Sequence, residues 1–207
     1  MKIGFTSTSF RQIKSIEKIV KIASESGADC IEWGGDIHVR SIEDARNAKY
    51  LCQKANIRIN SYASYYRVGS CDEAEWRKIC EIASAMNAET VRVWLGKADS
   101  EKTDDKTYAR LVEDAKSMCA VAAEYGIKVC PECHGNTYNN NTDAFLRIRE
   151  DVGFDNFIIM HKLFLALAKK FKCIFAADFF VDEPDFLVEV ARFVAFGADF
   201  LNSSSRF

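Results

Sequence analysis

Residues 13–38 read IKSIEKIVKIASESGADCIEWGGDIH and contain one complete unit of the predicted fold. The first half has apolar residues at the 3.6-residue period of a helix, whose buried side would carry Ile13, Ile16, Ile19, Val20 and Ala23. Gly27 follows where helices commonly end, because glycine tolerates the left-handed backbone of a C-terminal cap. The apolar run at residues 30–33 then predicts a strand that ends on polar residues.

The same order of helix, glycine or asparagine, and short apolar strand recurs along the chain. The second helix should begin at Ser41 and Asp44, which form a capping-box pattern. Further strands are predicted over residues 57–61, 90–94, 128–132 and 156–161, each after a helix that ends near Asn56, Asn87, Gly126 or Gly153. Strands that alternate with helices in this way indicate βαβ units and a parallel sheet.

Two α/β architectures fit this pattern, an open doubly wound sheet and a closed barrel. No G-x-G-x-x-G motif opens the first helix, which weakens the dinucleotide-binding interpretation. The even spacing of the units favours a single domain over residues 1–207, built as a (β/α)8 TIM barrel that is minimal or incomplete at its C-terminus. In such a barrel the ends of all strands meet at one mouth, where active sites lie.

Residues 162–207 form an atypical tail that contains ten of the fifteen phenylalanines and no Trp or Tyr. Helices over 162–170 and 185–196 and strands over 173–177 and 199–202 are predicted here. Together with the five strands above and an N-terminal strand that ends at Thr6 and Ser7, they bring the predicted strands to eight. The sixth and seventh strands would start only about 17 residues apart, close to the shortest crossover. The tail therefore either closes a minimal barrel or ends an incomplete one. An open barrel would expose these phenylalanines and favour a homo-oligomer or aggregation.

The composition is that of a globular protein with a core, since 48% of residues are hydrophobic and 28% are charged. A net charge of −2 gives no reason to expect nucleic acid or an anionic membrane as a partner. The sequence has no apolar run of about 18 residues and no secretory signal, so we expect a cytoplasmic protein with reduced cysteines. Cys130 and Cys133 form a C-x-x-C motif without the second pair that a zinc site needs.

Titratable and aromatic residues follow the predicted strands. Glu32 and Trp33 end the second strand, and Asp36 and His38 follow a Gly-Gly turn. This segment would bind a metal or hydroxyl groups, or it is a turn capped by Asp36 with a solvated His38. Glu132 and His134, two residues apart, would face the same way on a strand and could hold a cation or move a proton. The alternative for this pair is a salt bridge at the barrel rim.

Three more residues at predicted strand ends are candidates for substrate binding. Tyr62 belongs to the run SYASYYR, which would stack on a sugar or base or pack at the rim. Arg92 and Trp94 share a face of the next strand. Arg92 would bind a carboxylate or phosphate through its planar guanidinium, or form an internal ion pair with Glu32 or Glu132.

The segments IGFTSTS, GADCIEWGGDIHV, NSYASYYRVG, TVRVWLG and ECHGNT, in this order, resemble the xylose isomerase-like barrels. These are known as sugar phosphate isomerases and epimerases and are related to endonuclease IV. The resemblance covers about residues 1–160 and implies a sugar substrate and a divalent metal, often Mn, Mg, Co or Zn. Glu132 matches the metal-binding glutamate that ends the family's fifth strand. His161 is an approximate match for the sixth-strand ligand, and Asp178 is the candidate near the seventh.

These observations predict a metal-dependent isomerase or epimerase that acts on a small sugar or sugar phosphate. Glu132 would hold the metal and help to move the proton, with His134 and His161 near substrate or metal. One alternative is a truncated, catalytically impaired barrel or carbohydrate-binding protein, in which the tail leaves isomerase activity weak or absent. An endonuclease IV-like phosphodiesterase fits less well, because three histidines in the whole chain cannot build its histidine-rich metal cluster.

Overall fold

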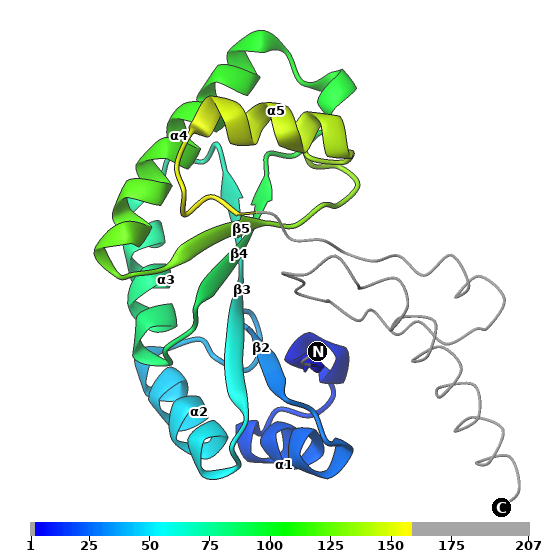
Figure 1. The fold of residues 1–207 in the computed structure, drawn as a ribbon, viewed down its shortest axis with the longest axis vertical. Helices are drawn as coiled ribbons and strands as arrows, with labels where there is room; N and C mark the ends of the chain where they lie inside the picture. The colour runs from blue at the N-terminus through cyan, green and yellow to red at the C-terminus, as the bar shows by residue number, and fades with distance from the viewer. Residues whose placement is uncertain (1–2, 159–207) are drawn as a thin grey trace, which may run out of the picture.

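The computed structural model describes residues 3–158, which form a parallel sheet with helices between its strands (Figure 1). The strands are β1 (Gly4–Thr6), β2 (Cys30–Gly34), β3 (Arg58–Val68), β4 (Thr90–Leu95) and β5 (Lys128–Pro131). The helices are α1 (Ile16–Ser26), α2 (Ile42–Lys54), α3 (Glu73–Ala85), α4 (Asp105–Glu124) and α5 (Thr142–Val152). Short 3-10 turns, η1 (Ser7–Phe10) and η2 (Ser100–Lys102), follow β1 and β4. The predicted α/β class is confirmed.

The order of the strands decides between the two architectures. The described sheet runs β1-β2-β3-β4-β5 and every neighbouring pair is parallel. A doubly wound sheet reverses its order at a switch point, and no reversal occurs among these strands. Right-handed crossovers that always move in one direction place their helices on one face. Figure 1 shows α2, α3 and α4 along the same side of the strands, as in the wall of a barrel.

The predicted sixth strand begins within the described residues. Phe157 forms a parallel bridge with Val129, and the Ile158 backbone N–H donates to the Val129 carbonyl over 2.9 Å. The next segment thus continues the sheet beyond β5 in the same direction. The rest of this strand, and every helix and strand predicted for the tail, lie outside the described residues.

Short polar side chains and left-handed residues cap the helices close to where the sequence indicates, except that α1 begins at Ile16 and leaves Ile13 in the preceding loop. Ser41 Oγ accepts from the Asp44 N–H over 3.1 Å, and the Asp44 carboxylate accepts from the Arg40 N–H over 2.9 Å. Gly27 and Asn87 adopt φ angles of 72° and 58° as the chain leaves α1 and α3. Within residues 3–158, no helix combines the length and the apolar surface that a membrane crossing requires.

The hydrophobic core lies between the sheet and the helices. Alternate residues of the central strands have no exposed surface and pack there, namely Ile31, Trp33, Val91, Val93 and Val129. Ile19 and Ala23 of α1 and Ala45 and Ala48 of α2 are equally buried and face them. Because side chains alternate along a strand, the residues between these core positions point into the barrel interior.

Several cysteines belong to this core, and their reactivity should reflect it. Burial raises the pKa of the Cys52 thiol to about 11 and those of Cys80 and Cys119 to about 12, whereas Cys71 is exposed. The thiolate is the reactive form, so iodoacetamide should modify Cys71 of the folded protein before Cys52, Cys80 and Cys119. Peptide mass spectrometry over time should find the three buried thiols modified only after unfolding. Early modification of Cys80 would contradict this packing of α3.

Candidate active site at the carboxyl ends of the strands

Two strands send a charged side chain into the barrel interior. Glu32 lies between the core residues Ile31 and Trp33 on β2, and Arg92 lies between Val91 and Val93 on β4. Glu32 is 4% exposed and Arg92 is 7% exposed. Charged residues are almost never buried to this extent unless they are paired, so their partners define the centre of the site.

Arg92 pairs with two carboxylates at once. Its Nε and Nη2 atoms each lie 3.1 Å from an oxygen of Glu32, which makes a two-pronged contact. Its Nη1 contacts Oε2 of Glu132, directly after β5. The sequence left open whether Arg92 pairs with Glu32 or Glu132, and the structure joins it to both. This buried ion-pair cluster links β2, β4 and the end of β5 and fixes the direction of the Glu132 carboxylate.

Trp94 lies at the next inward position of β4, nearer the mouth. Its indole Nε1 donates to Glu132 Oε2 over 2.9 Å, and its ring lies 5.5 Å from the His134 ring at an interplanar angle of 30°. The Arg67 guanidinium carbon, from the residue paired with Trp94 on β3, is 4.4 Å from the indole centroid. The indole thus touches both predicted catalytic residues, Glu132 and His134, and brings them together.

Tyr65 contributes a second aromatic ring, which the sequence interpretation did not single out. The pairing of β3 with β4 shifts between Ala63 and Arg67, and Tyr65 within this irregularity has a φ of 60°. A bulky residue rarely adopts a positive φ, and bulges near active sites redirect side chains. The Tyr65 ring meets Trp94 edge-on at 5.3 Å, and its hydroxyl accepts from Arg11 Nη2 over 2.8 Å.

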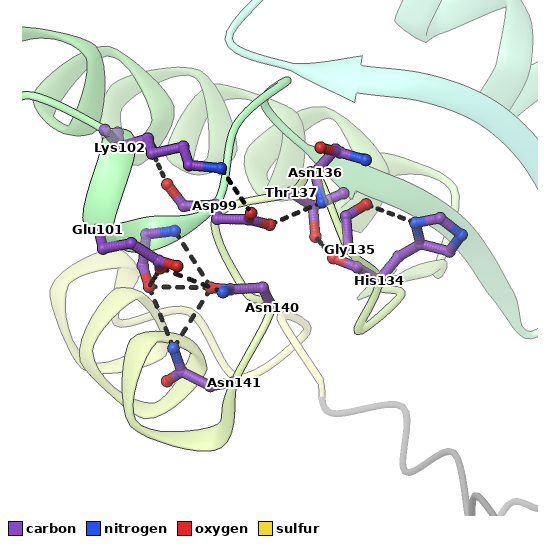
Figure 2. A network of polar contacts seen from close by, with 11 residues as sticks. Asp99, Glu101, Lys102, His134, Gly135, Asn136, Thr137, Asn140 and Asn141 are labelled. Atoms are coloured by element: carbon purple, nitrogen blue, oxygen red, sulfur yellow. Dashed lines mark hydrogen bonds and ion pairs between the residues drawn. The ribbon is translucent and has the colours of Figure 1, made fainter.

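Two loops at the mouth are joined by polar contacts, which Figure 2 shows. Residues 96–104 connect β4 to α4, and residues 132–141 connect β5 to α5. Asn140 Oδ1 accepts from the backbone N–H of Ser100 over 3.1 Å and from its hydroxyl over 2.8 Å. The Asn136 N–H donates to Asp99 Oδ1 over 2.7 Å. These bonds hold the loop that carries His134 against its neighbour.

The β5–α5 loop is also braced internally. Asn139 Nδ2 donates to the Glu132 carbonyl over 2.9 Å, and the Thr137 hydroxyl donates to the His134 carbonyl over 2.6 Å. His134 Nδ1 lies 2.6 Å from the Gly135 carbonyl oxygen, which can only accept, so Nδ1 carries the proton. The backbone on both sides of Glu132 and His134 is therefore anchored, as a site that positions reacting groups requires.

Three other residues predicted to bind substrate lie apart from this cluster. Trp33 is fully buried in the core next to the helices, since alternation turns it away from Glu32. Tyr62, 3% exposed, donates its hydroxyl to the Val39 carbonyl over 3.0 Å, and burial raises its pKa well above the usual value. His38 is buried between Ser7 Oγ at 3.0 Å and the Ile13 carbonyl at 2.7 Å. In this structure all three brace loops or core.

The described residues contain only part of the ligand set that the family resemblance implies. His161 and Asp178 lie outside the described residues. Within residues 3–158, no three His, Cys, Asp or Glu side chains gather as a metal site would require. Glu132 lies at the expected strand end, but Oε2 of its carboxylate is bonded to Arg92 and Trp94. These residues therefore do not form a metal site by themselves.

The family model of the xylose isomerase-like TIM barrel matches residues 20–178 of this sequence. The chain belongs to this family. The match includes the strand ends from Glu32 to Glu132 and runs past residue 160, where the resemblance seen in the sequence stopped. Membership in the xylose isomerase-like family explains the sequential strand order and confirms the predicted barrel architecture. No curated protein sequence matches the chain.

Solved structures of the same family share this fold. The probable 3-DHS dehydratase AsbF of Bacillus anthracis is 21% identical, with a TM-score of 0.69, and the match covers 77% of this chain and 62% of that protein. A D-psicose 3-epimerase of Clostridium cellulolyticum H10, solved with D-tagatose, is 17% identical, with a TM-score of 0.63 and coverages of 77% and 63%. A D-allulose 3-epimerase of Methylomonas sp. is 20% identical, with a TM-score of 0.61 and coverages of 77% and 62%. The chain thus spans a little under two thirds of these proteins, and identities this low establish the fold alone.

Proposed function

We propose that this protein is an isomerase or epimerase of a small sugar or sugar phosphate and depends on a divalent metal. The observation that carries the proposal is the contact of Glu132 and His134 with one indole, that of Trp94, at the carboxyl ends of the strands. A carboxylate and an imidazole held beside an aromatic face are suited to bind a sugar ring and move a proton on it. Family relatives solved with D-tagatose and D-allulose support a sugar as substrate.

The residues of the site would divide the work of binding and proton transfer. Trp94 and Tyr65 would pack against the C–H faces of the sugar, at right angles to each other (87° between rings). His134 would accept or return a proton through Nε2, because its Nδ1 is bonded to the Gly135 carbonyl. Arg92 would keep the Glu132 carboxylate aimed at Trp94. An isomerase removes a proton at one carbon and returns it at a neighbouring one, and an epimerase returns it to the same carbon from the opposite face, so either reaction uses a group that can both accept and donate a proton.

A divalent cation, when bound, polarises carbonyl and hydroxyl oxygens of a substrate. Glu132 is the described residue that would hold it, and the other donors would come from the segment outside the described residues, where His161 and Asp178 are the predicted ones. The engagement of Glu132 by Arg92 and Trp94 supports a second candidate, a carbohydrate-binding protein without turnover. In that case the ion-pair cluster would serve only to shape the mouth.

Metal analysis and a sugar panel would separate these functions. We expect the purified chain to bind Mn²⁺ or Co²⁺ and to convert at least one ketose or ketose phosphate, with activity lost in EDTA and restored by metal. His134→Gln should lower kcat by about 10²-fold or more with a smaller change in KM, as expected for a group that transfers protons. Lys21→Ala, on the exposed surface of α1, is the control. Saturable sugar binding without turnover would favour the binding protein, and no sugar binding would contradict both.

A further inference from the structure

We propose that Asp99 is a positioning residue that sets the tautomer and orientation of His134 through a single peptide group. Asp99 belongs to the β4–α4 loop and bonds to the backbone of the loop that carries His134, so it would act through the backbone between them. The inference deepens the proposed function, because it explains how His134 would present Nε2 to a substrate. The hydrogen bonds that connect Asp99 to His134 are present whichever reaction the site performs.

The connecting group is the peptide between Gly135 and Asn136 (Figure 2). Its carbonyl oxygen is 2.6 Å from His134 Nδ1, and its N–H donates to Asp99 Oδ1 over 2.7 Å. A carboxylate, an amide and an imidazole thus form one continuous hydrogen-bonded chain. The peptide carbonyl can only accept, which requires the proton on Nδ1 and leaves the lone pair on Nε2.

The charge of Asp99 polarises this series of hydrogen bonds, from the carboxylate through the peptide group to the imidazole. A bond from an N–H to a carboxylate is stronger than a neutral one, and it polarises the amide so that its carbonyl becomes a better acceptor. Asn136 has a φ of 60°, in the left-handed region that asparagine adopts more readily than other non-glycine residues. The bond from its N–H to Asp99 fixes the plane of the peptide in this conformation. The His134 ring is held at the same time against Trp94 at 5.5 Å.

Other contacts keep the two loops together independently of Asp99. Asn140 binds Ser100, and the Tyr138 N–H donates to the Leu95 carbonyl over 2.7 Å. Loss of the Asp99 carboxylate should therefore remove the restraint on the peptide group between Gly135 and Asn136 and leave the fold intact. Asp99 itself is oriented by Lys102, whose Nζ is 3.5 Å from Oδ2 on the opposite side of the carboxylate.

The test is the ring tautomer of His134, measured by nitrogen NMR on full-length protein labelled at histidine and kept at a pH where the ring is neutral. His134→Gln assigns the signals among the three histidines. Wild type should show mainly the Nδ1–H form. Asp99→Ala should shift the population to a mixture or to the Nε2–H form, and Asp99→Asn should lie between, because its amide oxygen still accepts but carries no charge.

Asp104→Ala is the matched control, because Asp104 lies in the same loop and accepts from the Thr107 N–H over 2.7 Å at the start of α4. This variant should leave the tautomer of His134 unchanged. The Nε2–H form in wild type, an unchanged tautomer in Asp99→Ala, or an equal change in Asp104→Ala would overturn the proposal. If wild type converts a sugar, Asp99→Ala should lower kcat several-fold with KM retained. A tautomer shift in a protein without turnover would refute the proposed function and uphold this inference.

Discussion

Replacing Arg92 with methionine should destabilise the folded protein by about 3–5 kcal/mol, the usual cost of leaving a buried charge without its partner. The substitution keeps an unbranched side chain but leaves the buried side chains of Glu32 and Glu132 without the guanidinium between them. Urea unfolding followed by circular dichroism would measure the loss. A lower urea midpoint with an unchanged m-value, the slope of the unfolding free energy against urea concentration, would show that the substitution lowers stability and does not change how much surface unfolding exposes.

A matched arginine on the neighbouring strand provides the control for this experiment. Arg67→Met removes a partly buried guanidinium that stacks on Trp94 and donates to the Gly96 carbonyl over 2.7 Å, so it should cost only about 1–2 kcal/mol. The double variant Arg92→Met/Glu32→Gln should recover part of the stability, because one of the two uncompensated charges is gone. Equal stability of wild type and Arg92→Met would mean that the three side chains are hydrated rather than buried together.

The fold could be predicted from the sequence because its signals are local. The apolar period of residues 16–23, the cap at Gly27 and the capping residues Ser41 and Asp44 each depend on a few neighbouring positions, and each forms the predicted structure. Ile13, also expected on this helix, lies before its cap at Ser15. The length of β3 was underestimated, since the strand was expected over residues 57–61 and extends over Arg58–Val68. Its continuation depends on pairing with β4, which local patterns do not report.

The site could be predicted only where alternation along a strand decides it. Glu32 and Arg92 lie inward as their strand positions require, and the same rule turns Trp33 toward the helices. Tyr65 replaces Tyr62 at the mouth because of an irregularity in register, which is set by the partner strand and has no signature in the run SYASYYR. The bond from Asp99 to the loop of His134 joins residues 37 positions apart, and no spacing rule indicates it.

Glu132→Gln should abolish high-affinity binding of divalent cations and lower kcat/KM by about 10²–10⁴-fold, if the proposed function is correct. Glutamine has the shape of glutamate and still offers an oxygen to the indole N–H of Trp94, so the packing of the site should persist. Only the charge is removed. Calorimetric titration with Mn²⁺ and turnover of the best sugar in the panel would measure the two effects.

Glu32→Gln makes this test specific, because it removes the charge of the other carboxylate that Arg92 binds. Each variant leaves Arg92 with one carboxylate, so both should lose similar, modest amounts of stability and less than Arg92→Met. Glu32 pairs with Arg92, whereas Glu132 also bonds to the indole that lies beside the His134 ring. Glu32→Gln should therefore keep cation affinity near that of wild type. If cations bind equally well to wild type and Glu132→Gln, the metal is held elsewhere and Glu132 serves the ion-pair cluster alone.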